Sequence, residues 1–216
     1  MNEFSRKTSS WISHGWKSLK GIPVGWKAAF IVFLILLADQ SLKIWVKTHM
    51  SIGESRYLFG SGEWAQLYFI ENNGMAFGLE FGGNLGKILL TSFRIVAVIA
   101  ILLYIRTLIR KNAHTGLVLT LAMVMAGALG NIIDSVFYGV IFGNYAPLFQ
   151  GRVVDMLYFP IIRTDSFTFF KPVFNLADSS ITIAVGIILI FQKRFFHHMN
   201  KEEEPAKENL TRSSES

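Results

Sequence analysis

Four long apolar stretches divide this chain, and each approaches the roughly 20 residues that a helix needs to cross about 30 Å of hydrocarbon. They cover residues 28–46, 85–105, 115–133 and 174–191. Hydrophobic residues make up 51% of the 216-residue chain, which is too apolar for a protein of this length that folds around one soluble core. The sequence therefore predicts an all-α membrane protein with four transmembrane helices.

Basic residues indicate the orientation of the predicted helices. They precede the first stretch, fill the short link between the second and third, and follow the fourth: Arg6, Lys7, Lys17, Lys20, Lys27, Arg106, Arg110, Lys111, Lys193, Arg194 and Lys201. By the positive-inside rule, both termini and the short link are cytoplasmic, and loops 47–84 and 134–173 face outward. The net charge of +6 thus follows topology, and no nucleic-acid partner is expected because the basic residues do not interleave with stacking aromatics on one face.

The chain divides into three parts. Residues 1–27 form a basic cytoplasmic leader, residues 28–194 the transmembrane domain, and residues 195–216 a polar cytoplasmic tail that is expected to be disordered because it can bury little apolar surface. The apolar run continues past Asp39, which favours an uncleaved start, and cleavage near Ala38 is the alternative.

The outer loops contain two further signals. The aromatic and β-branched run from Leu67 to Ile70 is followed by the turn residues Asn72, Asn73 and Gly74, which predicts a small extracytoplasmic β platform. The second outer loop contains an apolar segment, residues 151–157, that is expected to fold back onto the mouth of the bundle.

Four of the five aspartates, Asp39, Asp134, Asp155 and Asp178, lie inside or at the edge of apolar segments. A carboxylate against hydrocarbon is costly, so such residues are candidates for function. The predicted topology brings Asp134, Asp155 and Asp178 to one depth, near the outer membrane boundary. Two carboxylates a few ångströms apart share one proton, so that one can deprotonate water while the other protonates a substrate carbonyl. This arrangement is typical of aspartyl proteases.

Other chemistries have weaker signals. The chain has no cysteine, and its five histidines are scattered without a pair at zinc-ligand spacing beside a glutamate. No Gly-x-Ser-x-Gly elbow supports a serine hydrolase, although Lys43 or Lys47 leaves a Ser-Lys dyad open. A proton-coupled transporter and a non-catalytic scaffold also remain as alternatives, and both would differ from a protease in not cleaving a substrate.

Several separated motifs carry a resemblance to a known family. They are Glu71–Gly78 (ENNGMAFG), Gly127–Asp134 (GALGNIID), Val153–Asp155 (VVD) and Phe174–Asp178 (FNLAD), together with Asp39 and Lys43 on the first helix. In this order they resemble bacterial lipoprotein signal peptidase, also called signal peptidase II, and the resemblance spans about residues 28–191.

This resemblance implies an intramembrane aspartyl endopeptidase that removes signal peptides from diacylglyceryl-modified prolipoproteins by cutting before the lipidated cysteine. Asp155 and Asp178 are implied as the catalytic pair. The supporting or substrate-binding residues are implied to be Asp39, Lys43, Asn72, Gly74, Asn131, Asp134, Arg152 and Asn175. The expected partners are lipid-modified prolipoproteins and membrane lipids. The expected state is a monomer in the bacterial inner membrane, with its site near the outer leaflet and with no metal or organic cofactor.

The chain departs from the family pattern at one position. Ser135 follows Asp134 where the family usually has an arginine. Arg152 or Arg94 could supply the missing positive charge, and we keep this as a hypothesis.

Overall fold

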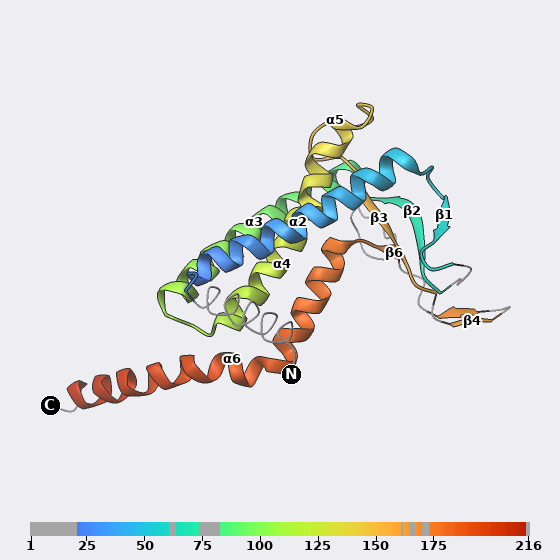
Figure 1. Ribbon diagram of the computed structural model, residues 1–216. Helices are drawn as coiled ribbons and strands as arrows, with labels where there is room; N and C mark the ends of the chain where they lie inside the picture. Colours follow the sequence, from blue (N-terminus) through green and yellow to red (C-terminus); the bar gives the residue numbers. More distant parts are fainter. Residues whose placement is uncertain are drawn as a thin grey trace, which may run out of the picture.

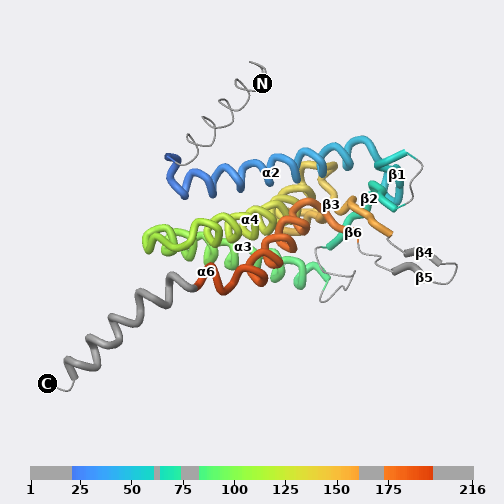
Figure 2. The backbone as a smooth tube through the Cα atoms, turned by 60° about the horizontal axis from the view of Figure 1, so that its bottom comes forward, coloured from blue at the N-terminus to red at the C-terminus, as the bar shows by residue number. Residues whose placement is uncertain are grey.

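A computed structural model describes residues 21–60, 64–73, 83–160, 162–164, 167–169 and 173–214. Four long helices dominate it: α2 (Val24–His49), α3 (Gly83–Arg110), α4 (Thr115–Ile133) and α6 (Leu176–Ser214) (Figures 1 and 2). Helix α4 contacts each of the other three and is the centre of the bundle.

The four helices are long and apolar enough to cross a membrane, over Val24–His49, Gly83–Arg110, Thr115–Ile141 and Leu176–Phe196. This confirms the predicted helical membrane fold. Half of the most apolar window of the third span is buried in the protein, against 17% in each of the others. The three outer helices therefore leave most of their apolar surface for lipid, which is expected because a bilayer does not penalise exposed leucine or phenylalanine.

The third span is longer than the sequence predicted. After α4 the chain continues as a five-residue π-helix, η2 (Asp134–Tyr138), and a short helix, α5 (Gly139–Ile141). Asp134 therefore lies within the helical span and not at its end. π-Helical turns inside longer helices are frequent at functional sites.

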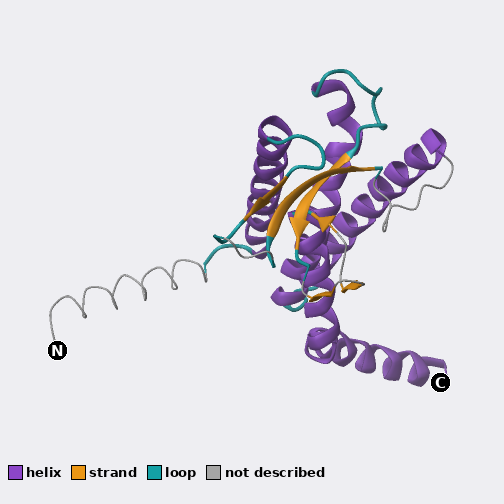
Figure 3. Cartoon of the chain, turned by 90° about the vertical axis from the view of Figure 1, so that its right-hand side faces the viewer, coloured by secondary structure: helices purple, strands orange, loops and turns teal. Residues whose placement is uncertain are grey.

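A small antiparallel sheet caps the end of the bundle where α2 ends and α6 begins (Figures 1 and 3). Its strand order is β1 (Ser55–Tyr57), β2 (Gln66–Asn72), β3 (Val153–Tyr158) and β6 (Val173–Phe174), and β4 (Ile162–Thr164) pairs with β5 (Phe167–Phe169) as a separate hairpin. The predicted β platform is confirmed. It is also larger than predicted, because the apolar segment that was expected to fold back onto the bundle forms the strand β3.

The two faces of the sheet differ in character. Phe69, Val154 and Met156 pack with residues of α2 and η2 in one buried apolar cluster. In the β2–β3 register, Ile70 is opposite Asp155 and Asn72 is opposite Val153. Because side chains alternate along a strand, Asn72 and Asp155 lie on the face away from that cluster. The sheet thus has a back that packs against this apolar cluster and a front that carries Asn72 and Asp155.

Two glycines allow α4 and its neighbours to approach closely. A Cβ on Gly127 would lie 2.3 Å from the carbonyl oxygen of Ala177 in α6. A Cβ on Gly130 would lie 2.7 Å from Oδ2 of Asp39 in α2. Small residues at such crossings are characteristic of membrane helices, where close backbone contact replaces the hydrophobic effect.

Some predictions concern residues outside the described ranges. The leader is described only from residue 21, and Gly74 is not described. The division into a leader, a domain over 28–194 and a tail from 195 remains a prediction.

We expect Gly127→Ala to lower the melting temperature of the protein in detergent, because overpacking of a tight contact typically costs about 1–3 kcal/mol. Gly186→Ala is the matched control: Gly186 lies in α6, the other helix of this crossing, and nothing is within 4 Å of the position of an added Cβ. A Gly127→Ala variant as stable as the parent would show that the α4–α6 crossing has room to relax.

Candidate active site

The site lies at the end of the bundle under the sheet, where three elements converge. Strand β3 places Asp155, the first turn of α6 places Asp178, and the last turn of α4 places Asn131. The side chain of Asp155 is buried at 3% exposure, whereas Asp178 is half-buried. The structure thus brings together the two aspartates that the sequence singled out, in unequal surroundings.

Two asparagine side chains connect these carboxylates. Asn175 Nδ2 donates to Asp155 Oδ1 at 2.7 Å, and Asn131 Nδ2 donates to Asp178 Oδ1 at 2.7 Å. The two amides also meet, because Asn175 Nδ2 lies 3.1 Å from Asn131 Oδ1. Asn175 Oδ1 accepts from the backbone N–H of Asp178 at 2.9 Å and so satisfies a free donor at the start of α6.

A third amide approaches Asp155 from the sheet. Asn72 Nδ2 donates to Asp155 Oδ2 at 3.2 Å, so both oxygens of this carboxyl accept a hydrogen bond. Burial raises the pKa of Asp155 to about 7, and the neighbouring charge of Asp178 adds to the rise. The hydrogen bonds from Asn72 and Asn175 and the charge of Lys43 oppose it. Near neutral pH, Asp155 can therefore either hold or release a proton.

Beneath the two aspartates, Lys43 is fully buried and its ammonium contacts three oxygens. Its Nζ lies 2.9 Å from Asp39 Oδ2, 2.8 Å from Asp134 Oδ2 and 3.1 Å from Asn131 Oδ1. Since an ammonium group has three N–H donors, each donor has one acceptor. We call Lys43, Asp39, Asp134 and Asn131 the Lys43 hub.

The hub also holds the backbone next to each aspartate of the pair. Asp39 Oδ1 accepts from the N–H of Ala177 at 2.9 Å, and Asp134 Oδ2 accepts from the N–H of Val154 at 3.2 Å. Ala177 precedes Asp178 and Val154 precedes Asp155. The buried ion pairs thus determine where both carboxylates lie.

Sequence reasoning missed Gln40. Its Nε2 lies 3.0 Å from Asp134 Oδ1 and 3.1 Å from Asp39 Oδ2, and its Oε1 accepts from the hydroxyl of Tyr138 at 3.0 Å. The available signal was a polar residue between Asp39 and Lys43 in an apolar stretch. Its partner Tyr138 lies in η2, which the sequence did not predict.

The structure also decides which cation neutralises Asp134. Lys43 does so, whereas Arg152 is exposed and its Nη1 lies 3.5 Å from Glu71 Oε2. That Arg152 or Arg94 supplies the charge of the missing arginine stays a hypothesis. Arg94 is half-buried on α3, and its charge interacts with Asp178, Asp155 and Asp134. Arg94 therefore supplements the hub and does not replace Lys43.

No three His, Cys, Asp or Glu side chains within the described ranges are grouped so that they could hold a metal ion. The polar groups of the site are instead paired with one another. The fold and site together define a class: a four-span helical membrane protein with linked carboxylates at the capped end of its bundle.

Comparisons with known proteins narrow this class. The family model described as Signal peptidase (SPase) II matches residues 31–194. The lipoprotein signal peptidase of Porphyromonas gingivalis is 40% identical, and the alignment covers 91% of this chain and 96% of the relative. The lipoprotein signal peptidase of Amoebophilus asiaticus is 37% identical, and the alignment covers 76% of this chain and 77% of the relative. Two solved structures of bacterial membrane enzymes are also similar, each with a TM-score of 0.54. The first is 28% identical and covers 77% of this chain and 88% of its own chain. The second is 29% identical and covers 76% of this chain and 90% of its own chain.

The chain belongs to the signal peptidase II family. It is accordingly a protease of the bacterial inner membrane that crosses the bilayer several times and removes signal peptides from prolipoproteins.

We expect Lys43→Met to lower the melting temperature strongly, because removal of one partner of a buried ion pair typically costs about 3–5 kcal/mol. The variant leaves Asp39 and Asp134 buried without their shared cation. Lys193→Met, which removes an exposed lysine of α6, is the control and should leave stability unchanged. Equal melting temperatures for the two variants would contradict the role assigned to the hub.

The raised pKa of Asp155 predicts a pH-dependent stability. Its folded value of about 7 lies above its ordinary value of 3.8, so its contribution is fully present below about pH 4 and is lost as pH rises through 7. The slope is about 1.4 kcal/mol per pH unit. Asp155→Asn removes this titration, so the melting temperature of the variant relative to the parent should rise from pH 4 to pH 7 and then level off. A difference that does not change with pH would show that Asp155 titrates at its ordinary value.

Proposed function

We propose that this protein is an intramembrane aspartyl endopeptidase in which Asp155 and Asp178 form the catalytic pair. In this proposal it cuts prolipoproteins immediately before the diacylglyceryl-modified cysteine. The observation that carries the proposal is the linkage of the two carboxylates through Asn131 and Asn175, with a pKa near 7 for Asp155. The alignment with lipoprotein signal peptidases over most of the chain supports the choice of substrate.

In the proposed mechanism the pair holds one proton. Asp155 carries it at neutral pH because of its raised pKa, and ionised Asp178 accepts a proton from the attacking water. The water oxygen bonds to the scissile carbonyl carbon while Asp155 protonates the carbonyl oxygen. When the carbon–nitrogen bond breaks, the leaving amine takes a proton from Asp178, and the proton of the new hydroxyl group returns to Asp155. The apparent pKa values then belong to the pair as a whole.

The position of the pair at the end of the bundle suits a membrane-inserted substrate. A signal peptide must unwind before water can attack it, because helical carbonyls are hydrogen-bonded. The front of the sheet, with Asn72 and Asp155, offers an extended surface beside which an unwound segment can lie. The lipid chains of the substrate stay in the bilayer against apolar side chains that the spans leave exposed, such as Phe93 at 70%.

The remaining parts of the proposal concern topology and assembly. Both termini are cytoplasmic, so the sheet and the carboxylate pair lie at the outer leaflet, because basic residues flank the opposite ends of the spans. The protein acts as a monomer, with residues 28–194 as the peptidase domain and with membrane lipids as its surroundings. Five residues position the pair: Asp39, Lys43, Asn131, Asp134 and Asn175. Asn72 lowers the pKa of Asp155 through its hydrogen bond, and Gly74 and Arg152 complete the supporting set.

The test is cleavage of a diacylglyceryl-modified prolipoprotein by the purified protein in lipid. Asp155→Asn and Asp178→Asn should each reduce kcat at least about 100-fold, because each removes a proton-transfer group. Glu54→Gln, which alters an exposed carboxylate beside the same sheet, is the control and should retain the parent rate. The same prolipoprotein without its lipid should be cleaved poorly.

Folded Asp155→Asn or Asp178→Asn protein with the parent rate would move the chemistry to another residue, such as Asp134. Equal cleavage of the modified and unmodified substrates would overturn the proposed recognition of the lipidated cysteine.

A further inference from the structure

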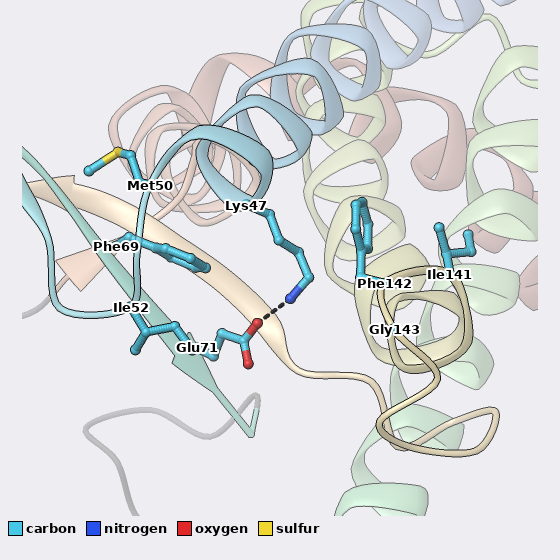
Figure 4. A pocket seen from close by; sticks show the side chains of 8 residues that line it. All are labelled: Lys47, Met50, Ile52, Phe69, Glu71, Ile141, Phe142 and Gly143. Carbon is cyan, nitrogen blue, oxygen red and sulfur yellow. Dashed lines mark hydrogen bonds and ion pairs between the residues drawn. The ribbon is translucent and has the colours of Figure 1, made fainter.

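The back of the sheet borders a second polar cluster, in a pocket of about 480 Å³ between the outer end of α2, strand β2 and the turn after α5 (Figure 4). Lys47 from α2 and Glu71 from β2 point toward each other in it and form an ion pair. Their side chains are only 9% and 8% exposed, although apolar residues such as Phe69 and Phe142 form much of the pocket wall. A nearly buried ion pair is energetically significant, unlike most surface pairs.

The same cluster connects four segments of the chain. Arg152, immediately before β3, approaches the second oxygen of Glu71 at 3.5 Å. The ammonium of Lys47 lies 5.3 Å from the ring centre of Phe142 and 5.1 Å from that of Tyr145, within the range of cation–π attraction. The backbone N–H of Arg152 donates to the hydroxyl of Tyr145 at 2.9 Å. We call Lys47, Glu71 and Arg152 the charge clamp.

The charge clamp holds Glu71, and the next residue on the strand, Asn72, contacts the proposed catalytic pair. Glu71 precedes Asn72 on β2, and alternation along the strand puts their side chains on opposite faces of the sheet. In the register, Glu71 is opposite Val154 and Asn72 is opposite Val153. Asn72 then donates to Asp155 from the front of the sheet while Glu71 is held from behind.

We propose that the charge clamp is a positioning device that holds the end of β2 so that Asn72 keeps its hydrogen bond to Asp155. This inference rests on the proposed catalytic role of Asp155. Glu71 is the central member, because without its charge the two cations Lys47 and Arg152 would face each other without a counter-ion. Glu71, Lys47 and Arg152 are therefore positioning residues, and none of them contacts the reacting atoms.

The consequence is a change in proton affinity. The hydrogen bond from Asn72 favours the ionised form of Asp155, so its loss raises the pKa of that carboxyl. The other groups around Asp155 are Asp178 at the start of α6, Asn175 before it, Lys43 on α2 and Arg94 on α3, and the clamp variants leave all of them in place. Weakening the clamp should thus move the alkaline limb of the pH profile of kcat, where Asp155 loses its proton, toward higher pH.

The experiment measures kcat and KM for the lipid-modified prolipoprotein from pH 5 to pH 9. Glu71→Gln should shift the alkaline limb of the kcat profile upward by about one pH unit, the effect expected for one hydrogen bond to a charged group, and leave KM within about twofold of the parent. Asn72→Ala should give the same shift, and adding Glu71→Gln to Asn72→Ala should produce no further shift. Glu54→Gln, which breaks the exposed pair with Arg56 beside the same sheet, should leave the profile unchanged.

A Glu71→Gln profile that superimposes on that of the parent, whatever its melting temperature, would overturn the clamp as a positioning device, and so would additive shifts in the double variant. Lys47→Met gives the same test if Glu71→Gln does not fold. Asp155→Asn, measured alongside, separates the two proposals: if it still cleaves, the proposed function fails, and if it is inactive while Glu71→Gln has the parent profile, only the clamp fails.

Discussion

The buried ammonium of Lys43 is the interaction on which the rest of this structure depends. A charge at this depth costs several kcal/mol unless it is paired and hydrogen-bonded, so its three partners must be in place whenever the protein is folded. Those partners come from α2, α4 and η2, and two of them also bind the backbone beside the aspartates of β3 and α6. One cation therefore couples the packing of three helices to the position of a strand.

Such coupling requires backbones that approach closely, and α4 supplies the small residues for it. Gly127 lies against the Ala177 carbonyl of α6, and Gly130 lies against the carboxylate of Asp39. Polar groups gather inside this end of the bundle, while the outer surfaces of the spans keep large apolar residues for lipid. The sheet extends this arrangement, with the buried cluster of Phe69, Val154 and Met156 behind it and with Asn72 and Asp155 on its front. The fold thus concentrates its polar groups at the end of the bundle that the sheet caps.

Length and hydropathy were sufficient to predict the four spans, because a bilayer imposes both on a helix. The unusual positions of the aspartates were sufficient to mark Asp39, Asp134, Asp155 and Asp178 as candidates. The choice of Asp155 and Asp178 among them depended on the family resemblance. The sequence did not predict β3, since its apolar run has no alternation and its partner β2 lies more than 80 residues earlier. Spacing on one helix pairs Asp39 with Lys43, but the contact with Asp134 depends on how α2 crosses α4. Gln40 was missed for the same reason, because its partners lie on another helix.

The distance between Lys43 and the aspartate pair has a chemical consequence. A lysine in direct contact with Asp155 would stabilise the ionised carboxylate and lower its pKa, which would remove the proton that the proposed mechanism requires. Here the ammonium donates to Asn131 Oδ1, and the amide nitrogen of Asn131 then donates to Asp178. The neutral amide of Asn131 thus lies between the two charged groups. It fixes Asp178 relative to Lys43, and the ammonium does not contact the carboxylate of Asp178 directly. Asn175 donates to Asp155 in the same way, so, within the part of the chain that the structure describes, neutral amides and no charged side chain hold this end of the carboxylate pair.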